Sequence, residues 1–282
     1  MRCLLLTVLL VAYLAIIAPF TDYLRDKPVI EKLGYVPQPA VLKVISADQK
    51  QTMAAWLVMK VLFYFGGLVE ASQNEIILPT DYPAMQINLT TAVELDPYNM
   101  DAYYFAQAVL VWDAGRIDEV NRMLEFGIEH RTWDWSLPFY TAFNSAYFQK
   151  DYHRAAKYYK RAAEISGYDL FSRLAGRYLY ETSQTDQAIA YLAVMEKNAR
   201  SDSIRKSFQL RLQALKAVQS VETALESYFK AYGRSAENIQ DLFSTGLLKA
   251  LPVDPYGGKF YLDRDGRVRT TSNFAFSSKK DR

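Results

Sequence analysis

Four segments with one repeated pattern decide the fold: MQINLTTAVEL (85–95), VNRMLEFGIEH (120–130), AAKYYKRAAEI (155–165) and AIAYLAVMEKN (188–198). Their first residues, Met85, Val120, Ala155 and Ala188, are separated by 35, 35 and 33 residues. The same steps relate two further sets of positions: Leu89, Leu124, Tyr159 and Leu192, and Ala92, Gly127, Ala162 and Met195. A period of this length is typical of stacked helical hairpins. It therefore predicts a mostly α-helical array over residues 46–200.

Short polar turns divide the repeats into pairs of helices. We expect pairs at Met100–Asp113 with Ile117–Glu129, Leu137–Gln149 with Tyr152–Ile165, and Leu170–Thr182 with Asp186–Asn198. Because the turns are short, each pair should be an antiparallel hairpin. A further helix should run to about Val69, starting at a capping box formed by Ser46 and Gln49. Its apolar part, 54–69, could be a second membrane span, but Lys60 and Gly66-Gly67 favour a buried core helix.

The segment KDYHRAAKYYKRA (150–162) resembles the second half of a tetratricopeptide repeat, and AVELDP (92–97) resembles the end of another. The resemblance covers about 54–197. The terminal proline occurs only in the first repeat, and its later counterparts are Thr132, Gly167 and Arg200. The resemblance implies a solenoid in which the first helix of each pair lines a concave surface that holds a partner.

Mapping that register onto this chain predicts a partner-binding groove. Its residues would be Phe105, Val109, Trp112, Tyr140, Asn144, Tyr147, Arg173, Arg177 and Tyr180. Aromatic rings supply rigid contact area, and Arg binds carboxylates, so this composition fits a binding surface. The alternatives are that Tyr140 and Tyr147 pack between helices, or that the long segment at 202–232 fills the groove.

The N-terminal segment is apolar from Cys3 to Phe20, which is just long enough to cross a bilayer as a helix. We expect residues 1–20 to be an uncleaved anchor, with a cleaved signal as the alternative. A count of the basic residues on either side of this segment would, by itself, place the rest of the protein in the cytoplasm. A short N-terminal region before a signal-like core favours a body outside, in a periplasm. Residues 21–45 read as a linker.

The C-terminal region contains a long amphipathic helix and a small mixed unit. Residues 201–233 are expected to cap the array, and 234–282 to form a short helix, a β-hairpin and a polar tail. The stretch LPVDPYGG (251–258) with its flanking helix and hairpin is similar to the C-terminal part of type II secretion major pseudopilins. The pilin-type N-terminal start is not present, so only a shared module is implied.

Little in the sequence points to chemistry. The net charge of +2 gives no reason to expect nucleic-acid binding. His130 and His153 have no partners at metal-ligand spacing, and no phosphate loop or nucleophile motif occurs. We expect no enzymatic activity, cofactor or metal. Whether Asp254, Asp263 and Asp265 bind calcium stays open, although an ordinary hairpin turn explains the last two better.

We expect a non-catalytic scaffold that crosses the bacterial inner membrane once and exposes its body to the periplasm. The resemblances to tetratricopeptide repeats and to the pseudopilin module imply that it holds another envelope protein, in a secretion, pilus or surface-polymer assembly system. The alternative function is ligand binding, with a small molecule or carbohydrate stacked on Trp112, Tyr140 and Tyr147.

Overall fold

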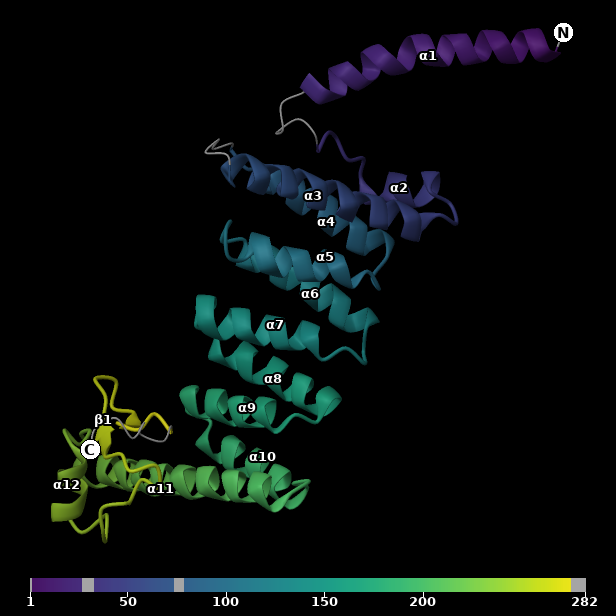
Figure 1. Cartoon of the computed structure of the whole chain (residues 1–282). Coiled ribbons are helices and arrows are strands. Elements are labelled where there is room, and N and C mark those ends of the chain that lie inside the picture. The colour runs from purple at the N-terminus through teal and green to yellow at the C-terminus, as the bar shows by residue number, and fades with distance from the viewer. Residues whose placement is uncertain (1, 27–32, 74–78, 275–282) are drawn as a thin grey trace. The chain divides into compact units, whose positions relative to one another are not determined.

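The computed structural model describes residues 2–26, 33–73 and 79–274. The chain is mostly helical, with one small antiparallel sheet of two strands (Figure 1). It divides into two compact units, residues 1–132 and 133–282, which are described separately. This division falls inside the array that the sequence predicts over 46–200.

The first unit consists of α1 (Arg2–Asp26), α2 (Pro39–Ile45), α3 (Lys50–Gln73), α4 (Tyr82–Leu95), α5 (Met100–Phe105), the π-helix η2 (Ala106–Leu110) and α6 (Ile117–His130). Helix α3 packs mainly on α4. Helix α4 has a proline, Pro83, in its first turn, and the Asp81 side chain accepts a hydrogen bond from Ala84 N at 3.0 Å. The cap satisfies one of the unpaired amides at the helix start.

The predicted linker at 21–45 contains helical structure. Helix α1 continues to Asp26, α2 begins at Pro39, and residues 27–32 lie outside the described ranges. The predicted capping box at Ser46 does not form, because Ser46 lies at the end of α2 and α3 begins only at Lys50. The Ser46 hydroxyl donates to Leu42 O at 2.6 Å.

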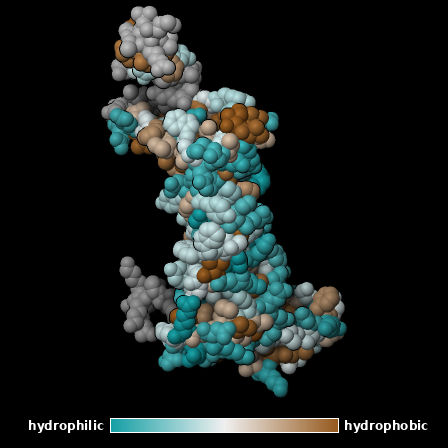
Figure 2. Space-filling view, turned by 90° about the vertical axis from the view of Figure 1, so that its right-hand side faces the viewer, coloured by the Kyte–Doolittle hydropathy of each residue, from teal (hydrophilic) through white to brown (hydrophobic). Residues whose placement is uncertain are grey.

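Helix α3 is apolar on both its buried and its exposed sides. Its buried residues are Ala54, Leu57, Val58, Val61, Tyr64 and Leu68, and its exposed apolar residues are Trp56, Met59, Leu62, Phe63 and Val69. Among the described residues, α3 is long and apolar enough to cross a membrane, whereas the apolar stretch Val8–Tyr23 within α1 is shorter. A core helix has the same composition, and α3 has one buried face. Figure 2 shows hydrophobic atoms gathered at the level of α2 and α3.

The second unit consists of α7 (Ser136–Asn144), η3 (Ser145–Gln149), α8 (Tyr152–Ser166), α9 (Asp169–Glu181), α10 (Thr185–Lys197), α11 (Asp202–Tyr232), α12 (Ile239–Ser244), β1 (Phe260–Leu262) and β2 (Val268–Thr270). From α7 to α11, each helix packs on the next one in the sequence. Helix α11 runs without a break and ends at Gly233, whose φ of 66° is the left-handed conformation that glycine tolerates at helix ends.

The first set of repeated positions is buried to the same extent and occupies the same place in each helix. Met85, Val120, Ala155 and Ala188 are each 0% exposed, and each stands in the first turn of the second helix of a pair. The second set is also buried: Leu89, Leu124, Tyr159 and Leu192. Gly176 of α9 lies so close to α10 that an added Cβ would stand 2.8 Å from Leu192 Cδ1. A small residue at that position lets the two helices approach.

The hairpin β1–β2 lies against helices α9 and α11. Phe260 pairs with Thr270, and Leu262 pairs with Val268. The hydroxyl of Tyr180 on α9 donates to Val268 O at 2.6 Å, and Arg269 contacts Glu181 Oε2 at 2.5 Å and Asp263 Oδ2 at 3.1 Å. The hairpin is therefore joined to α9 by a buried hydrogen bond and an ion pair. The predicted polar tail, 275–282, lies outside the described residues.

Replacing Gly176 tests the close approach of α9 and α10. We expect Gly176→Val to lower the free energy of unfolding by about 1–3 kcal/mol, because the added side chain overpacks Leu192. Urea unfolding followed by circular dichroism measures the change. The control is Gly66→Val in α3, where nothing lies within 4 Å of an added Cβ. Equal effects of the two substitutions would show that the approach is unimportant.

Candidate functional site

In the first unit, the three predicted groove residues do not share one exposed surface. Phe105 is half-buried, with its ring 5.6 Å from that of Phe65, and Trp112 is 54% exposed. Val109 is only 6% exposed, so it offers little surface to a partner. The reason is η2, in which wider π-type turns replace the α-helical spacing used to align Phe105, Val109 and Trp112.

In α7 and η3, the groove residues again separate by exposure. Tyr147 is 55% exposed and Tyr140 is half-buried, whereas Asn144 is 0% exposed and belongs to the interior. Tyr140 and Asn144 both lie in the α-helical part of α7, so the π-helix that follows does not explain their different exposure. Because Asn144 is fully buried, its side chain offers no surface to a partner.

In α9, Arg177 is exposed, Arg173 is half-buried and Tyr180 is 6% exposed. Tyr180 is closed off because Phe274 packs edge-on against its ring at 5.0 Å and β2 accepts its hydroxyl hydrogen bond. Burial raises the pKa of Tyr180 to about 12, although the charge of Arg269 opposes this. Tyr180 therefore offers little surface to a partner, because β2 and Phe274 cover it.

Tyr147 and Arg177 are brought together in an aromatic cleft of about 410 Å³, which we call the α7–α9 cleft. Its other residues are Phe139, Phe143, Ala146, Lys150, Tyr152, Tyr159, Leu174, Tyr178 and Glu181. Tyr140 and Arg173 do not line it. Most of these aromatic residues were not predicted as site residues, although their density in 139–159 was visible in the sequence.

The rings of the α7–α9 cleft form two stacks. Tyr147 lies parallel to Phe143, with centroids 5.4 Å apart, and Tyr178 stacks between Tyr152 and Tyr159 at 5.5 Å from each. Lys150 Nζ stands 5.4 Å from the centre of the Tyr147 ring, and the Arg177 guanidinium 5.9 Å from that of Tyr178. Burial raises the pKa of both Tyr159 and Tyr178, so these phenols stay neutral. The cleft offers flat apolar faces edged by two cations.

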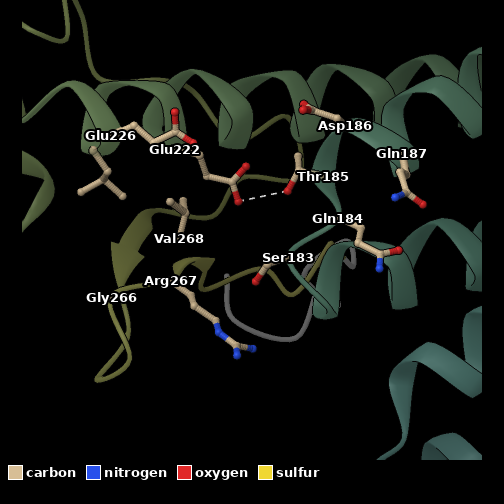
Figure 3. Close-up of a pocket in the computed structure, with 11 residues that line it drawn as sticks. Ser183, Gln184, Thr185, Asp186, Gln187, Glu222, Glu226, Gly266, Arg267 and Val268 are labelled. Carbon is tan, nitrogen blue, oxygen red and sulfur yellow. Dashed lines mark hydrogen bonds between the residues drawn. The ribbon is translucent and has the colours of Figure 1, made fainter. Parts of the chain in front are cut away.

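A second, polar pocket of about 470 Å³ lies between α10, α11 and the hairpin (Figure 3). Thr185 Oγ1 donates to Glu222 Oε1 at 3.0 Å, and Asp186 and Glu226 also line the pocket. Burial raises the pKa of Glu222, the Thr185 hydrogen bond lowers it in part, and the charges of Asp186 and Glu226 raise it further. The sequence alone could not reveal this pocket, because its lining residues come from three separate segments, 183–187, 222–226 and 266–268.

Asp254 and Asp263, beside and within the C-terminal hairpin, accept hydrogen bonds that hold its turns. Asp254, 3% exposed, accepts hydrogen bonds from Tyr256 N at 2.8 Å, from Ser272 Oγ at 2.6 Å and from the Thr270 hydroxyl. Asp263 accepts from Asp265 N and Arg267 N across the β-turn and pairs with Arg269. Within the described ranges, no three His, Cys, Asp or Glu residues form a group that could hold a metal ion.

The two histidines have ordinary partners. His130 Nδ1 lies 2.8 Å from Phe126 O, and its ring packs on that of Phe126 at 4.4 Å. His153 Nδ1 lies 3.2 Å from Gln184 Nε2. Neither histidine is positioned beside a nucleophile in these contacts.

A scan of the chain against protein-family models found no match, and a search of curated proteins found no significant match. The function must therefore be inferred from the geometry described above.

The raised pKa of Glu222 gives a pH-dependent prediction. The folded chain keeps a proton on Glu222 to higher pH than the unfolded chain, whose Glu pKa is about 4.3, so this group lowers stability as the pH rises above that value. We expect Glu222→Gln to raise the thermal midpoint at pH 7, because the amide oxygen still accepts from Thr185.

The difference between Glu222→Gln and the unmodified protein should shrink towards zero at about pH 3, where Glu222 is protonated in both the folded and the unfolded chain. Thermal unfolding at several pH values measures it, and Glu237→Gln, at an exposed position, is the control. A difference that does not change with pH would contradict the electrostatic explanation.

Proposed function

We propose that the protein is a non-catalytic scaffold, attached to the bacterial inner membrane, that holds another envelope protein. The observation that carries this proposal is the α7–α9 cleft, in which Tyr147 is 55% exposed beside Phe143, Arg177 and Lys150. Aromatic and Arg side chains at a hollowed surface are the residue types that contribute most to protein binding.

The packing order supports a repeat-type scaffold. Helices α7 to α11 each pack on the next in sequence, and the positions that recur every 33 to 35 residues are buried alike. A tetratricopeptide-like solenoid is the architecture that such packing favours. Solenoids of this kind use the surface between successive helices for binding, which is where the α7–α9 cleft lies.

Two apolar helices support membrane attachment. In α1, the described apolar side chains are exposed, including Leu9, Leu10, Leu14 and Phe20. Helix α3 adds an exposed apolar face with Trp56, Met59 and Phe63. Water disfavours such surfaces, whereas lipid accommodates them. We place α1 in the membrane, the body in the periplasm, and the partner in a secretion, pilus or surface-polymer assembly system.

A ligand-binding function is the second candidate, and the parallel stack of Tyr147 on Phe143 favours it. An exposed, flat ring at a cleft can also hold the apolar face of a sugar. Binding of a defined oligosaccharide, lost in Tyr147→Ala, would favour this candidate over the scaffold.

Crosslinking in membranes tests the scaffold proposal with the full chain. We expect Tyr147→Ala with Arg177→Glu to reduce the amount of crosslinked partner at least about tenfold, because truncating a central aromatic and a cation typically costs 2 kcal/mol or more. Quantitative mass spectrometry after pull-down is the measurement.

The matched control is Lys206→Glu with Tyr232→Ala, which makes the same tyrosine truncation and the same change in charge at exposed positions of α11. Both pairs of substitutions should leave the circular dichroism spectrum unchanged. Full partner recovery with the cleft variant would refute binding at the α7–α9 cleft.

A further inference from the structure

One side of α3 is apolar and exposed along most of the helix, and we call it the α3 face. Its residues are Trp56, Met59, Leu62, Phe63, Gly66 and Val69. Phe63, near the middle of the set, is 69% exposed. The exposed side of α3 becomes polar before this set, at Gln51 and Thr52, and after it, at Glu70. The α3 face is therefore a bounded apolar patch, at the level where Figure 2 shows hydrophobic atoms gathered.

The composition of the α3 face suits lipid better than the polar surface of another protein. The indole N–H of Trp56 is the one side-chain hydrogen-bond donor in the set, and no side-chain oxygen occurs in it. Protein interfaces that form and dissociate are only about 56–58% apolar and have a polar rim. Lipid chains need no hydrogen-bonding partner, and Trp is enriched where a membrane meets water. Lys60, half-buried beside the face, has a stem long enough to bring its ammonium group to the lipid headgroups.

The opposite side of α3 holds this helix against α4. Leu57, Val61 and Leu68 are buried there, and the Tyr64 hydroxyl accepts a hydrogen bond from Asp81 N at 2.8 Å. To cross a bilayer alone, α3 would have to leave these contacts. Helix α4 has 14 residues, fewer than the about 20 that a span requires, so the two helices do not fit across a membrane together. While it stays packed on α4, α3 can meet lipid only with its exposed side.

The covalent chain keeps α3 near the end of α1. Helix α1 ends at Asp26, and Leu33 is already fully buried, with 1% exposure. Even when fully extended, the chain from Asp26 to Leu33 spans at most about 25 Å. With α1 in the bilayer, α2 and α3 are the first helices outside it, and this short tether gives them a high effective concentration at the membrane surface. Weak contact with lipid is then sufficient to hold the α3 face there.

We propose that α3 lies along the membrane surface, with the α3 face in contact with lipid. Interfacial helices bury their apolar side about 5–10 Å into the boundary between headgroups and acyl chains, a depth that covers Trp56, Met59 and Phe63. The inference goes beyond the scaffold proposal and does not involve the α7–α9 cleft. It rests on one part of the proposed function, the attachment through α1.

Spin labels on the full chain test this placement. Cys3, the only cysteine, is replaced by Ser, and single cysteines at Met59, Phe63 or Gly66 each carry a nitroxide. The protein is reconstituted into vesicles of phosphatidylcholine and phosphatidylglycerol. Electron paramagnetic resonance measures collisions of each label with oxygen, which concentrates in lipid, and with a water-soluble nickel chelate. We expect oxygen to dominate at all three positions and the chelate to dominate at Arg122→Cys, an exposed position of α6.

The depth of the labels distinguishes a helix that lies on the membrane from one that crosses it. Met59 and Gly66 are separated by two turns and lie on the same side of α3. A helix lying along the surface places both labels at nearly the same depth. A crossing helix separates them by about 10 Å, because each residue adds 1.5 Å along the axis. A further label at Leu10 of α1 reports separately on the attachment.

A charge on the α3 face tests whether this face causes the contact. In Phe63→Glu, the label at position 59 should lose its oxygen preference and reach the chelate accessibility measured at position 122, since burying a carboxylate is costly. The matched control is Phe229→Glu, which makes the same change at a position of α11 that is 57% exposed. Because both side chains are exposed, the circular dichroism spectrum should not change in either variant.

Each outcome either supports or overturns the placement. Labels at equal, shallow depth that move into water in Phe63→Glu and stay in lipid in Phe229→Glu support it. Labels shielded from both reagents would show that a second copy or another protein covers the face, and unequal depths would show a crossing helix; both overturn it. Labels of α3 in water with Leu10 in lipid overturn this inference alone, whereas water at both places also removes the proposed attachment.

Discussion

Close packing of each helix on the next one in sequence is the constraint on which the second unit depends. Gly176 brings α9 against Leu192 of α10, and Ala155 and Ala188 are fully buried in their respective helices. Small residues permit this approach, and the apolar area that it buries supplies the main stabilisation. Each helical hairpin buries one face against its neighbour, so the last one, α9–α10, needs another element over its open face. Helix α11 and the β1–β2 hairpin cover it.

That cover also determines which side chains remain available for binding. The hairpin accepts the Tyr180 hydroxyl hydrogen bond and places Phe274 on its ring, so the surface of α9 is open at Arg177 and closed at Tyr180. Further back in the chain, the π-helix η2 contains the buried Val109, whereas Trp112, just beyond it, is exposed. The π-helix η3 contains the exposed Tyr147.

Arg269 and Arg211 make different kinds of contact in the C-terminal region. Arg269 is neutralised by Glu181 and Asp263, and it joins the hairpin to α9. Arg211 lies over the rings of Tyr256 and Phe274, and its Nη2 donates to Phe274 O at 3.1 Å. The first arrangement is an ion pair, and the second holds the C-terminal segment on α11 through ring contacts and a backbone carbonyl.

Periodicity in the sequence determined the helical hairpins, their boundaries to within a few residues, and the burial of the recurring positions from Met85 to Leu192. The spacing of apolar residues reports directly which side of a helix avoids water. Tertiary structure decided the covering of Tyr180 and the meeting of Arg211 with Tyr256 and Phe274. These depend on contacts between residues distant in the chain, 88 positions apart for Tyr180 and Val268, and no local pattern encodes such contacts.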